Sequence, residues 1–369
     1  MISAVRVERL TARGFRNLES LDLTIAPGFV IIEGRNGQGK TNLLEALYVC
    51  ATGRSFRGSP PRELVRHSGE SSQLDALFVR QSVRHQVEVN IAKNRRTVRV
   101  DGRGLRKTSQ LLDLVNVVAF FPDDLRVIKG SPEERRRFLD RSAANFKGAL
   151  VDAAASYEKA LRSRNRLLRD ERRVDPAMLE VYDEQLCRFG EVIHQCRLEA
   201  LGKLRPEAQR VFGDLMDEGL EITLDLDSGI PGLVDTDFCQ GFIRALGASH
   251  QRDVARGSTS VGPHRGDLIV RLNGHDARSF GSQGQQRAAV LSLKLAEVRI
   301  LAVELDSPPI LLLDDVSSEL DVERTQALFG SIESLQTQVW VSTTGAAPLP
   351  LPDTAQRLRM ASGKLTEMV

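Results

Sequence analysis

The residues best suited to chemistry form a glycine-rich segment near the N-terminus, where a buried-strand pattern runs into the spacing G-x-x-x-x-G-K-T. In such a phosphate-binding loop (P-loop), glycines let backbone N–H groups turn towards phosphate oxygens, where a Cβ atom would collide. Lys40 is the counter-charge for the β- and γ-phosphates, and the Thr41 hydroxyl is a ligand for Mg²⁺. The helix that follows directs the positive end of its dipole at the anion. The predicted ATP-binding residues are Gly34, Arg35, Asn36, Gly37, Gln38, Gly39, Lys40 and Thr41.

An acidic motif lies far downstream. Residues 310–313 are all apolar and precede Asp314 and Asp315, as in a buried parallel strand that presents carboxylates at its C-terminal end. In this Walker B pattern, Asp314 holds Mg²⁺ directly or through water, and Asp315 polarises the attacking water. Lys40 and Asp315 are therefore the predicted catalytic residues. Without the P-loop, the same run would read as a strand that enters a turn.

Two further segments complete an order of motifs. One precedes a helical pattern over residues 286–301 and, alone, reads as a helix cap. After a P-loop and around a Walker B strand, the two segments match an ABC-type signature (S-x-G-Q) and D-loop (S-x-L-D). In ABC-type heads the signature contacts the γ-phosphate held by the partner subunit, so the order predicts an ATP-dependent homodimer. The predicted signature is Ser282, Gln283, Gly284 and Gln285, and the D-loop residues are Ser318 and Asp321.

These motifs and several others resemble the RecF family of bacterial DNA replication and repair proteins, over residues 5 to 345. The segments that carry the resemblance are 13–17 (RGFRN), 36–45 (NGQGKTNLLE), 53–57 (GRSFR), 121–125 (FPDDL), 135–140 (RRRFLD), 262–265 (GPHR) and 282–287 (SQGQQR). The resemblance implies recognition of gapped DNA at junctions of single and double strand. It also implies a role in the SOS response and cooperation with RecR and RecO in loading RecA.

The sequence departs from the wider ABC pattern in three places. Asp315 stands where many ABC ATPases have Glu. Its shorter side chain places the carboxylate about one methylene further from the attacking water, which predicts slow turnover. Residues 342–344 (STT) contain no histidine for a switch loop. No Q-loop glutamine is found near residues 121–125, where Asp123 and Asp124 are the remaining candidates.

The periodicity predicts an α/β lobe with an inserted helical arm. With the order of motifs above, the predicted fold class is α/β, an ABC-type P-loop ATPase head with an inserted helical arm. Alternating strand patterns dominate up to about residue 130, and none returns until about Leu220. Between them, a heptad-like apolar seam follows Asp175 and Pro176, an N-cap and first helical residue, and Pro206 is expected to interrupt or kink this helix. The helical run over residues 147–172 should pack back against it, as in a short antiparallel coiled coil. The predicted ranges are 1–130 and 251–369 for the head and 131–250 for the arm.

Positive charge is clustered although the net charge is only +2. Clustered arginines can bind phosphates, but each cluster also reads as an ordinary solvated face. Aromatic residues make up 5% of the chain, which argues against a base-stacking platform, so bound DNA is expected to be held by its backbone. The predicted DNA contacts are Arg54, Arg57, Arg95 and Arg96.

Other compositional signals are weak. The four cysteines form no C-x-x-C pair, which predicts reduced structural thiols and no metal centre other than Mg²⁺. No segment resembles a signal peptide or is apolar for long enough to span a bilayer, so a cytoplasmic location without membrane attachment is expected. The cysteines are Cys50, Cys187, Cys196 and Cys239.

Two other functional classes stay open. The chain could be the ATPase subunit of a transporter or of a nuclease complex, but a transporter has no use for a basic inserted arm, and the sequence shows no nuclease-like carboxylate cluster. The second class is a structural clamp that binds ATP without hydrolysing it. The sequence favours a weak, DNA-stimulated ATPase whose hydrolysis acts as a switch.

Overall fold

The computed structural model describes residues 5–92, 95–105, 107, 109–112, 114–121, 124, 126–169, 175–216, 219–233, 237–304, 308–315, 322–333, 336–345 and 351–367. The chain divides into two compact units. One, the head, contains Met1–Asp124 and Leu293–Val369, and the other, the arm, contains Leu125–Ser292.

The head is built on a six-stranded, mainly parallel sheet in the order β15-β14-β3-β13-β12-β8. Its central strands are short apolar runs buried on both faces, as parallel strands are when helices or a second sheet cover them. Only β15 pairs antiparallel, with β14. The strands are β3 (Phe29–Glu33), β8 (Val117–Phe120), β12 (Ile310–Asp314), β13 (Val339–Thr343), β14 (Gln356–Ala361) and β15 (Lys364–Glu367).

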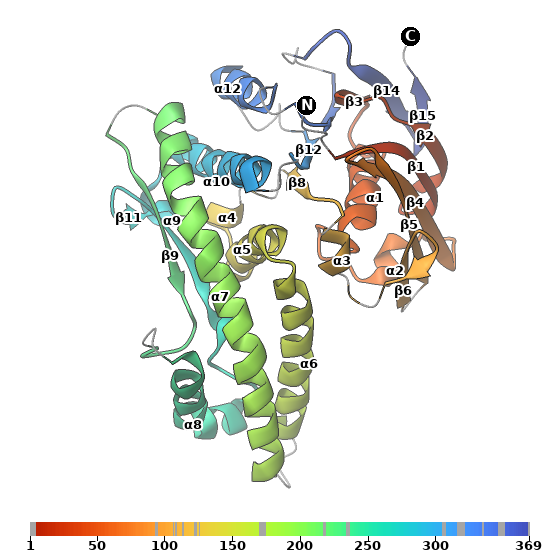
Figure 1. Cartoon of the computed structure of the whole chain (residues 1–369). Coiled ribbons are helices and arrows are strands. Elements are labelled where there is room, and N and C mark those ends of the chain that lie inside the picture. Colours follow the sequence, from red (N-terminus) through yellow and green to blue (C-terminus); the bar gives the residue numbers. More distant parts are fainter. Residues whose placement is uncertain are drawn as a thin grey trace. The chain divides into compact units, whose positions relative to one another are not determined.

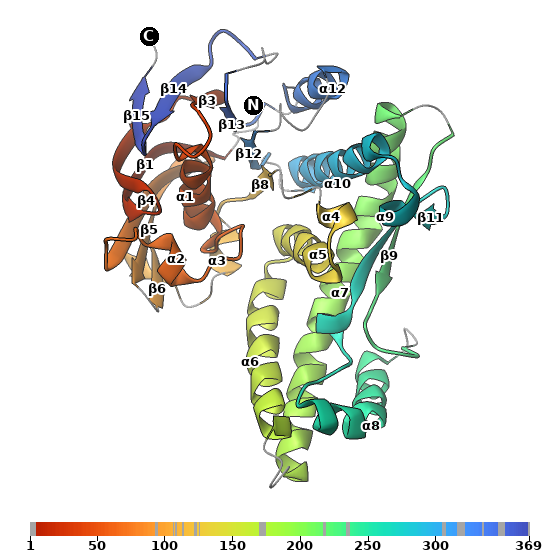
Figure 2. The ribbon, with the colours of Figure 1, turned by 180° about the vertical axis from the view of Figure 1, so that it is seen from behind.

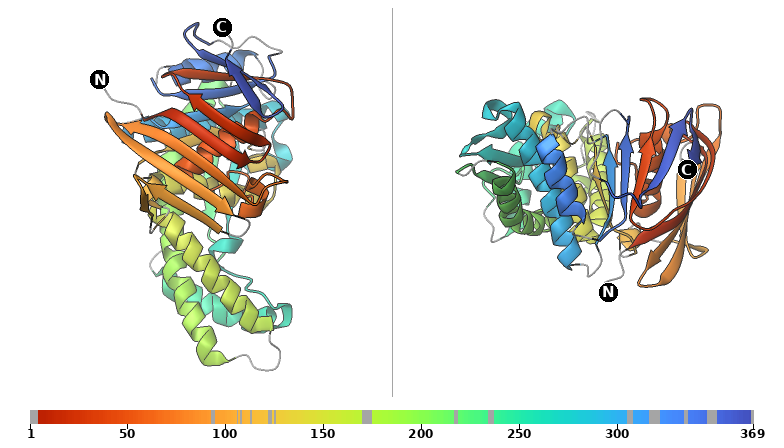
Figure 3. Two further views of the ribbon diagram at one scale, coloured as in Figure 1. Left: turned by 90° about the vertical axis from the view of Figure 1, so that its right-hand side faces the viewer. Right: turned by 90° about the horizontal axis from the view of Figure 1, so that it is seen from above.

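A second six-stranded sheet of the head is antiparallel, in the order β2-β1-β4-β5-β6-β7. Buried and exposed positions alternate along β1, β4 and β5, so one face is covered and the other faces solvent. Figure 3 (left) shows its red to orange strands face-on. The strands are β1 (Arg6–Phe15), β2 (Leu18–Thr24), β4 (Ser71–Arg80), β5 (Val83–Ala92), β6 (Arg95–Val100) and β7 (Arg103–Gly104).

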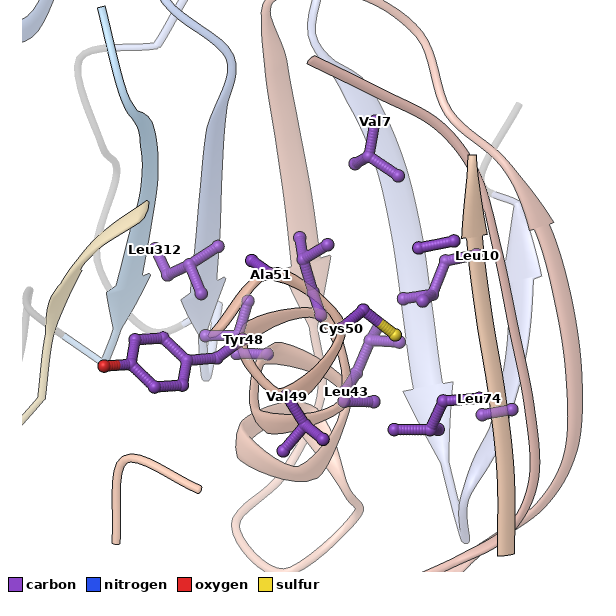
Figure 4. Packing of buried hydrophobic residues seen from close by; sticks show 14 of the residues in the cluster. Val7, Leu10, Leu43, Tyr48, Val49, Cys50, Ala51, Leu74 and Leu312 are labelled. Carbon is purple, nitrogen blue, oxygen red and sulfur yellow. The ribbon is translucent and has the colours of Figure 1, made fainter. Parts of the chain in front are cut away.

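Helix α1 (Lys40–Thr52) lies between the two sheets of the head and contacts strands of both. Figure 4 shows its apolar side chains with Leu10 and Leu74 of the antiparallel sheet on one side and Leu312 of the parallel sheet on the other. A helix buried all round needs apolar residues on every face, and Leu43 to Thr52 are all buried. The core therefore fixes the helix whose first residues are Lys40 and Thr41. The other helices assigned wholly to the head are α2 (Pro61–Leu64), α3 (Ser109–Leu112) and α12 (Val322–Glu333).

The arm is dominated by two helices, α6 (Ala149–Arg169) and α7 (Pro176–Leu215), which lie side by side (Figure 1). The Asp175 side chain accepts hydrogen bonds from the N–H groups of Ala177 and Met178, which confirms the predicted N-cap. Of the two outcomes expected at Pro206, an interruption is wrong, because α7 continues through this residue. Pro206 and Gly202 are exposed, so water can satisfy the Gly202 carbonyl that proline leaves without a donor. At 1.5 Å per residue, the 40 residues of α7 span about 60 Å.

A three-stranded antiparallel sheet and α8 (Phe238–Arg256) pack against α7 (Figure 2). The sheet consists of β9 (Ile222–Asp227), β10 (Asp267–Leu272) and β11 (His275–Asp276). Because β10 pairs with β9, the arm extends to Ser292, beyond the residue 250 expected from periodicity. The Arg135 guanidinium donates two hydrogen bonds, both 2.7 Å long, to the carboxylate of Asp267 in β10. The other helices of the arm are α4 (Arg126–Lys129), α5 (Pro132–Phe146) and α9 (Ala277–Phe280), and α10 (Gln283–Glu304) begins in it.

The cysteine prediction is wrong for one pair. Cys187 of α7 and Cys239 of α8 form a disulfide, with Cα atoms 5.3 Å apart. The two residues are 52 positions apart, so their spacing gave no signal; only the packing of α8 on α7 brings them together. Cys50 and Cys196 are free and buried, as expected.

His264 is part of a buried polar cluster in the arm. Its Nε2 lies 3.1 Å from the Thr259 carbonyl and must donate to it, and its Nδ1 lies 2.8 Å from the Tyr157 hydroxyl, from which the neutral ring accepts. Burial lowers the His264 pKa to about 4, against a smaller opposing effect of the Thr259 carbonyl. Gly262 lies beside this cluster, and a Cβ there would come within 2.7 Å of the Tyr157 hydroxyl.

This histidine should make the stability of the protein fall in acid. The folded-state pKa lies below the unfolded value of about 6.5, so the unfolded chain takes up a proton that the folded chain excludes. The stabilisation is complete above pH 6.5 and should decline by up to about 3 kcal/mol as the pH falls towards 4. Urea unfolding of the parent and of His264→Gln at pH 7.5 and pH 5 measures this difference. Equal losses of stability in the two proteins would contradict the assignment.

Candidate nucleotide-binding site

The P-loop joins β3 to α1, and its glycines are required by what lies next to them. A Cβ on Gly34 would lie 2.4 Å from the carbonyl oxygen of Met360 in β14. Gly39 has φ 115°, and a Cβ there would lie 2.8 Å from the Asn17 amide group. Neither position can take another residue without a shift of the backbone or of Asn17. The loop therefore passes between two neighbouring segments with room for backbone alone.

Lys40, the first residue of α1, is folded back into the loop. Its Nζ donates to the carbonyl oxygens of Gly34 at 2.6 Å and of Arg35 at 3.2 Å, and the residue is 6% exposed. Burial lowers the Lys40 pKa, while the charges of Asp315 and Asp314 oppose that effect. The ammonium group is thus held beside the loop and near both Walker B carboxylates, where a phosphate would be a stronger acceptor than the two carbonyls.

Thr41 and Asp314 meet, although 273 residues separate them in the chain. The Thr41 hydroxyl lies 2.8 and 3.0 Å from the two carboxylate oxygens of Asp314. Ser342 of β13 donates to the same carboxylate at 2.6 Å, because Asp314 and Ser342 are paired in neighbouring parallel strands. Burial raises the Asp314 pKa, and the hydrogen bonds from Ser342 and Thr41 counteract this.

These oxygen donors suit Mg²⁺. The ion prefers carboxylate and hydroxyl oxygens and keeps several of its waters, so one carboxylate and one hydroxyl are a sufficient protein contribution. The Thr41–Asp314 contact places both donors within one coordination sphere. Thr41 and Asp314 would therefore hold the ion.

Asp315 leaves the strand in a left-handed conformation, with φ 49°. Its N–H donates to the carbonyl oxygen and hydroxyl of Ser342, at 3.2 and 3.1 Å. A non-glycine residue in this region is uncommon, and aspartate is among the residues that tolerate it best.

The tip of the P-loop is held by two turns whose contact with the loop could not be seen from the sequence motifs. Asn17, between β1 and β2, donates to the Gln38 carbonyl at 3.1 Å and accepts from the Asn42 side chain at 2.8 Å. In the turn between β14 and β15, the N–H of Gly363 donates to the Gln38 carbonyl at 2.9 Å. The N–H of Ser362 donates to the Gln38 side chain at 2.6 Å. Gln38 is thus the point at which both sheets fix the loop.

A buried ion-pair network supports α1. The Glu45 side chain is fully buried and pairs with Arg16 at 3.0 Å and with Arg57 at 3.2 Å. Arg57 also donates to Asn42. Removing one partner of a buried pair typically costs about 3–5 kcal/mol, because the remaining charge stays buried. Arg57, one of the predicted DNA contacts, is thus engaged in an ion pair next to the P-loop helix, and its contact with DNA stays a prediction.

A cavity of about 750 Å³ adjoins this part of the head. Asn17 and Asn42, which touch each other and the P-loop, are in its wall, and several cationic or ionisable side chains face it. Its lining residues are Arg16, Asn17, Asn42, Arg57, Arg62, Glu63, Val65, Arg66, His67 and Gly69.

The predicted signature lies at the N-terminus of α10, in the arm. Ser282 and Gln285 form a reciprocal cap: the Ser282 N–H donates to the Gln285 side chain at 2.9 Å, and the Gln285 N–H lies 3.2 Å from the Ser282 hydroxyl. Ser282 and Gln283 are exposed and Gly284 is half-buried. A helix N-terminus that is capped in this way can also bind a ligand, since its exposed N–H groups can donate to an anion.

Other predicted residues have different outcomes. Asp124 is buried, accepts from the Phe121 N–H and pairs with Lys294 at 3.4 Å, so it stabilises its own loop. Asp123 and the D-loop residues Ser318 and Asp321 lie outside the described residues.

Burial and the neighbouring charge of Arg54 lower the Arg96 pKa, which places these two arginines close together. Arg95 is exposed at the adjacent position of β6, and neighbouring side chains of a strand point to opposite faces.

Comparison with known proteins agrees with this site. The family model described as the RecF/RecN/SMC N terminal domain matches residues 6–366. The chain is 39% identical over 348 residues to the DNA replication and repair protein RecF of Myxococcus xanthus, covering 92% of this chain and 91% of that protein. It is 33% identical over 362 residues to RecF of Clostridium acetobutylicum, covering 98% and 99%.

Solved structures give the same result. The recombination mediator protein RecF-ATPrS in the RecFOR pathway is similar with a TM-score of 0.89 and 29% identity, covering 100% of this chain and 99% of that chain. An Smc head bound to the C-winged helix domain of ScpA shares the fold, with a TM-score of 0.55 and 16% identity, covering 98% and 97%. The predicted fold class, an ABC-type head with a helical arm, is confirmed. The chain belongs to the RecF family of DNA replication and repair proteins.

Proposed function

We propose that this protein is an ATP-dependent DNA-binding switch of recombinational repair and replication restart. The main supporting observation is that Thr41 contacts Asp314 while Lys40, beside it in the chain, is folded back into the P-loop. These groups suit a nucleoside triphosphate and its Mg²⁺. In this proposal the protein acts in the cytoplasm on gapped DNA, hydrolyses ATP slowly, and cooperates with RecR and RecO in loading RecA. Among the described residues, no helix is long and apolar enough to cross a membrane.

Each of these residues of the head has its own role in ATP binding and hydrolysis. Lys40 exchanges its two carbonyl acceptors for the β- and γ-phosphates, and the N–H groups between Gly34 and Thr41 bind the remaining phosphate oxygens. Mg²⁺, when bound by Thr41 and Asp314, neutralises charge that develops on the phosphates. Asp315 orients and polarises the attacking water. Its short side chain reaches less far than the glutamate of many ABC ATPases, which makes slow hydrolysis the expected behaviour.

The nucleoside end of ATP would occupy the 750 Å³ cavity. Asn17 and Asn42 connect that cavity to the P-loop through their hydrogen bonds to each other and to Gln38. Within the described part of the chain, the lining contains no Phe, Tyr or Trp, so the base would be held mainly by polar and cationic side chains, with the His67 imidazole as the one ring that faces the cavity. This placement uses only residues of the head.

Duplex DNA would be held by its phosphates. Arg54 and Arg96 form a local concentration of positive charge, and each phosphate contact adds salt sensitivity rather than sequence preference. Affinity for DNA should therefore fall steeply with ionic strength.

ATP should also drive dimerisation, because Ser282 and Gly284 offer a hydroxyl and an N–H to a γ-phosphate that ADP lacks. We expect Ser282→Arg to bind ATP normally but to stay monomeric. The parent should form at least about ten times more dimer with a non-hydrolysable ATP analogue than with ADP, a difference of about 1.4 kcal/mol. Sedimentation velocity measures this, with Gln185→Arg, an exposed position of α7, as the matched control. A dimeric Ser282→Arg protein would refute the signature assignment.

The experiment that tests the proposed function compares ATP hydrolysis with and without duplex DNA and assays the same DNA for cleavage. DNA-stimulated phosphate release without cleavage is expected. Cleavage would place the chain with nucleases, and tight ATP binding without phosphate release would make it a clamp. An equal rate of ATP hydrolysis with and without DNA would contradict the proposal of a DNA-dependent switch.

A further inference from the structure

The arm contains a small cavity between the first turns of α7 and the middle of α8, with a volume of about 280 Å³. We call it the arm pocket. Leu179 and Leu246, which are 5% and 1% exposed, form its apolar base, and Ile243 lies at its edge with 48% of its surface exposed. The pocket is lined by Pro176, Leu179, Glu180, Asp183, Glu184, Ile243, Leu246, Gly247 and His250. Its volume is small for a metabolite and suits a single anchoring side chain.

One wall of the arm pocket is bare backbone. Gly247 lies inside α8, a position at which glycine is unfavourable compared with alanine. An ideal Cβ built on Gly247 meets no atom within 4 Å, and its φ is not in the left-handed region, so neither crowding nor backbone conformation requires glycine here. The missing side chain leaves space open towards Leu246 and Ile243.

The charged residues at the pocket are mainly acidic. Asp183 is already paired with Arg164 at 2.6 Å. Glu180 and Glu184 are exposed, and within the part of the chain that the structure describes neither forms an ion pair. They are four positions apart on α7, where two like charges repel each other. A cation bound between or beside them would relieve that repulsion.

We propose that the arm pocket docks a segment of another protein that presents a leucine, isoleucine or methionine side chain, with lysine or arginine within one helical turn of it. The aliphatic side chain would fill the space over Gly247 against Leu179 and Leu246. The basic residues would pair with Glu180 and Glu184. DNA is a poor occupant, because the same carboxylates repel its phosphates.

The test uses a variant that fills the pocket without disturbing the helix. Gly247→Leu places its side chain in open space, and Gly202→Leu makes the same change at an exposed glycine of α7 whose Cβ also meets nothing within 4 Å. Both variants should unfold at the same temperature as the parent or higher, because leucine is the better helix former. A phage-displayed library of random 12-residue peptides is selected on the parent, after depletion on Gly247→Leu.

The recovered peptides should share an aliphatic residue flanked by lysine or arginine. Their affinity, measured by fluorescence anisotropy with synthetic peptides, should fall at least tenfold on Gly247→Leu and stay unchanged on Gly202→Leu. Glu180→Lys combined with Glu184→Lys should weaken binding at least tenfold, and Gln at both positions by less.

Several results would overturn the proposal. They are a failure to recover peptides that distinguish the parent from Gly247→Leu, or a consensus without basic residues. A change in self-association caused by Gly247→Leu would make a second copy of this chain the occupant, and a change in DNA affinity would make it nucleic acid. ATP hydrolysis should be the same in all these variants, so the outcome is independent of the proposed switch.

Discussion

Replacing Lys40 by methionine should abolish productive ATP binding and leave the protein folded. The Lys40 ammonium is buried and folded back into the P-loop. A charged hydrogen bond to phosphate is worth about 1.5–3 kcal/mol, which corresponds to roughly a 10- to 100-fold loss of affinity. The fold should tolerate the change, because burial lowers the Lys40 pKa and the buried charge therefore opposes folding. Without nucleotide, the variant should melt at the parent's temperature or above it.

Equilibrium binding of a fluorescent ATP analogue and the shift in melting temperature caused by ATP measure both parts of this prediction. Lys40→Arg is the control: it keeps the charge but not the compact shape of the ammonium, so its loss should be smaller. If Lys40→Met bound and hydrolysed ATP like the parent, the nucleotide site would have to lie elsewhere in the chain.

Asp315→Asn should keep ATP and Mg²⁺ bound and slow hydrolysis by about 10²–10⁴-fold, the usual contribution of a positioned general base. Asparagine has nearly the same shape, so the left-handed turn at φ 49° and the backbone bonds to Ser342 should persist. The variant should therefore accumulate the ATP-bound state.

Asp314→Asn is the matched comparison, since it removes the other carboxylate of the same turn. It should weaken Mg²⁺ binding itself, because Asp314 is the carboxylate in contact with Thr41. Nucleotide affinity at several Mg²⁺ concentrations and single-turnover phosphate release separate the two variants. Normal turnover by Asp315→Asn would remove Asp315 from the water-activating role.

The parts of the site that the sequence predicted are those encoded by local spacing. The glycines, Lys40 and Thr41 lie within one short segment, residues 34–41, and an apolar run that ends in two carboxylates indicates a buried strand wherever it lies in the chain. Both motifs end parallel strands of one sheet, which brings Thr41 and Asp314 together across 273 residues. The N-cap at Asp175 was predictable for the same reason, because the capped N–H groups follow within three residues.

The contacts that the sequence did not reveal depend on long-range register. Ser342 reaches Asp314 only because β13 pairs with β12, and a serine at a strand end has no distinguishing signal. Ser362 meets Gln38 from 324 residues away through the β14–β15 turn. The disulfide between Cys187 and Cys239 and the extension of the arm to Ser292 likewise follow from packing on α7 and pairing with β9.

The proposed switch requires that nucleotide state control DNA binding. The most direct measurement is the affinity of the parent for a duplex with a single-stranded tail, by fluorescence anisotropy at fixed ionic strength, with a non-hydrolysable ATP analogue, with ADP and without nucleotide. We expect binding at least about tenfold tighter with the analogue than with ADP, a coupling of about 1.4 kcal/mol, and loss of this difference in Lys40→Met. Equal affinity in all three nucleotide states would contradict the account.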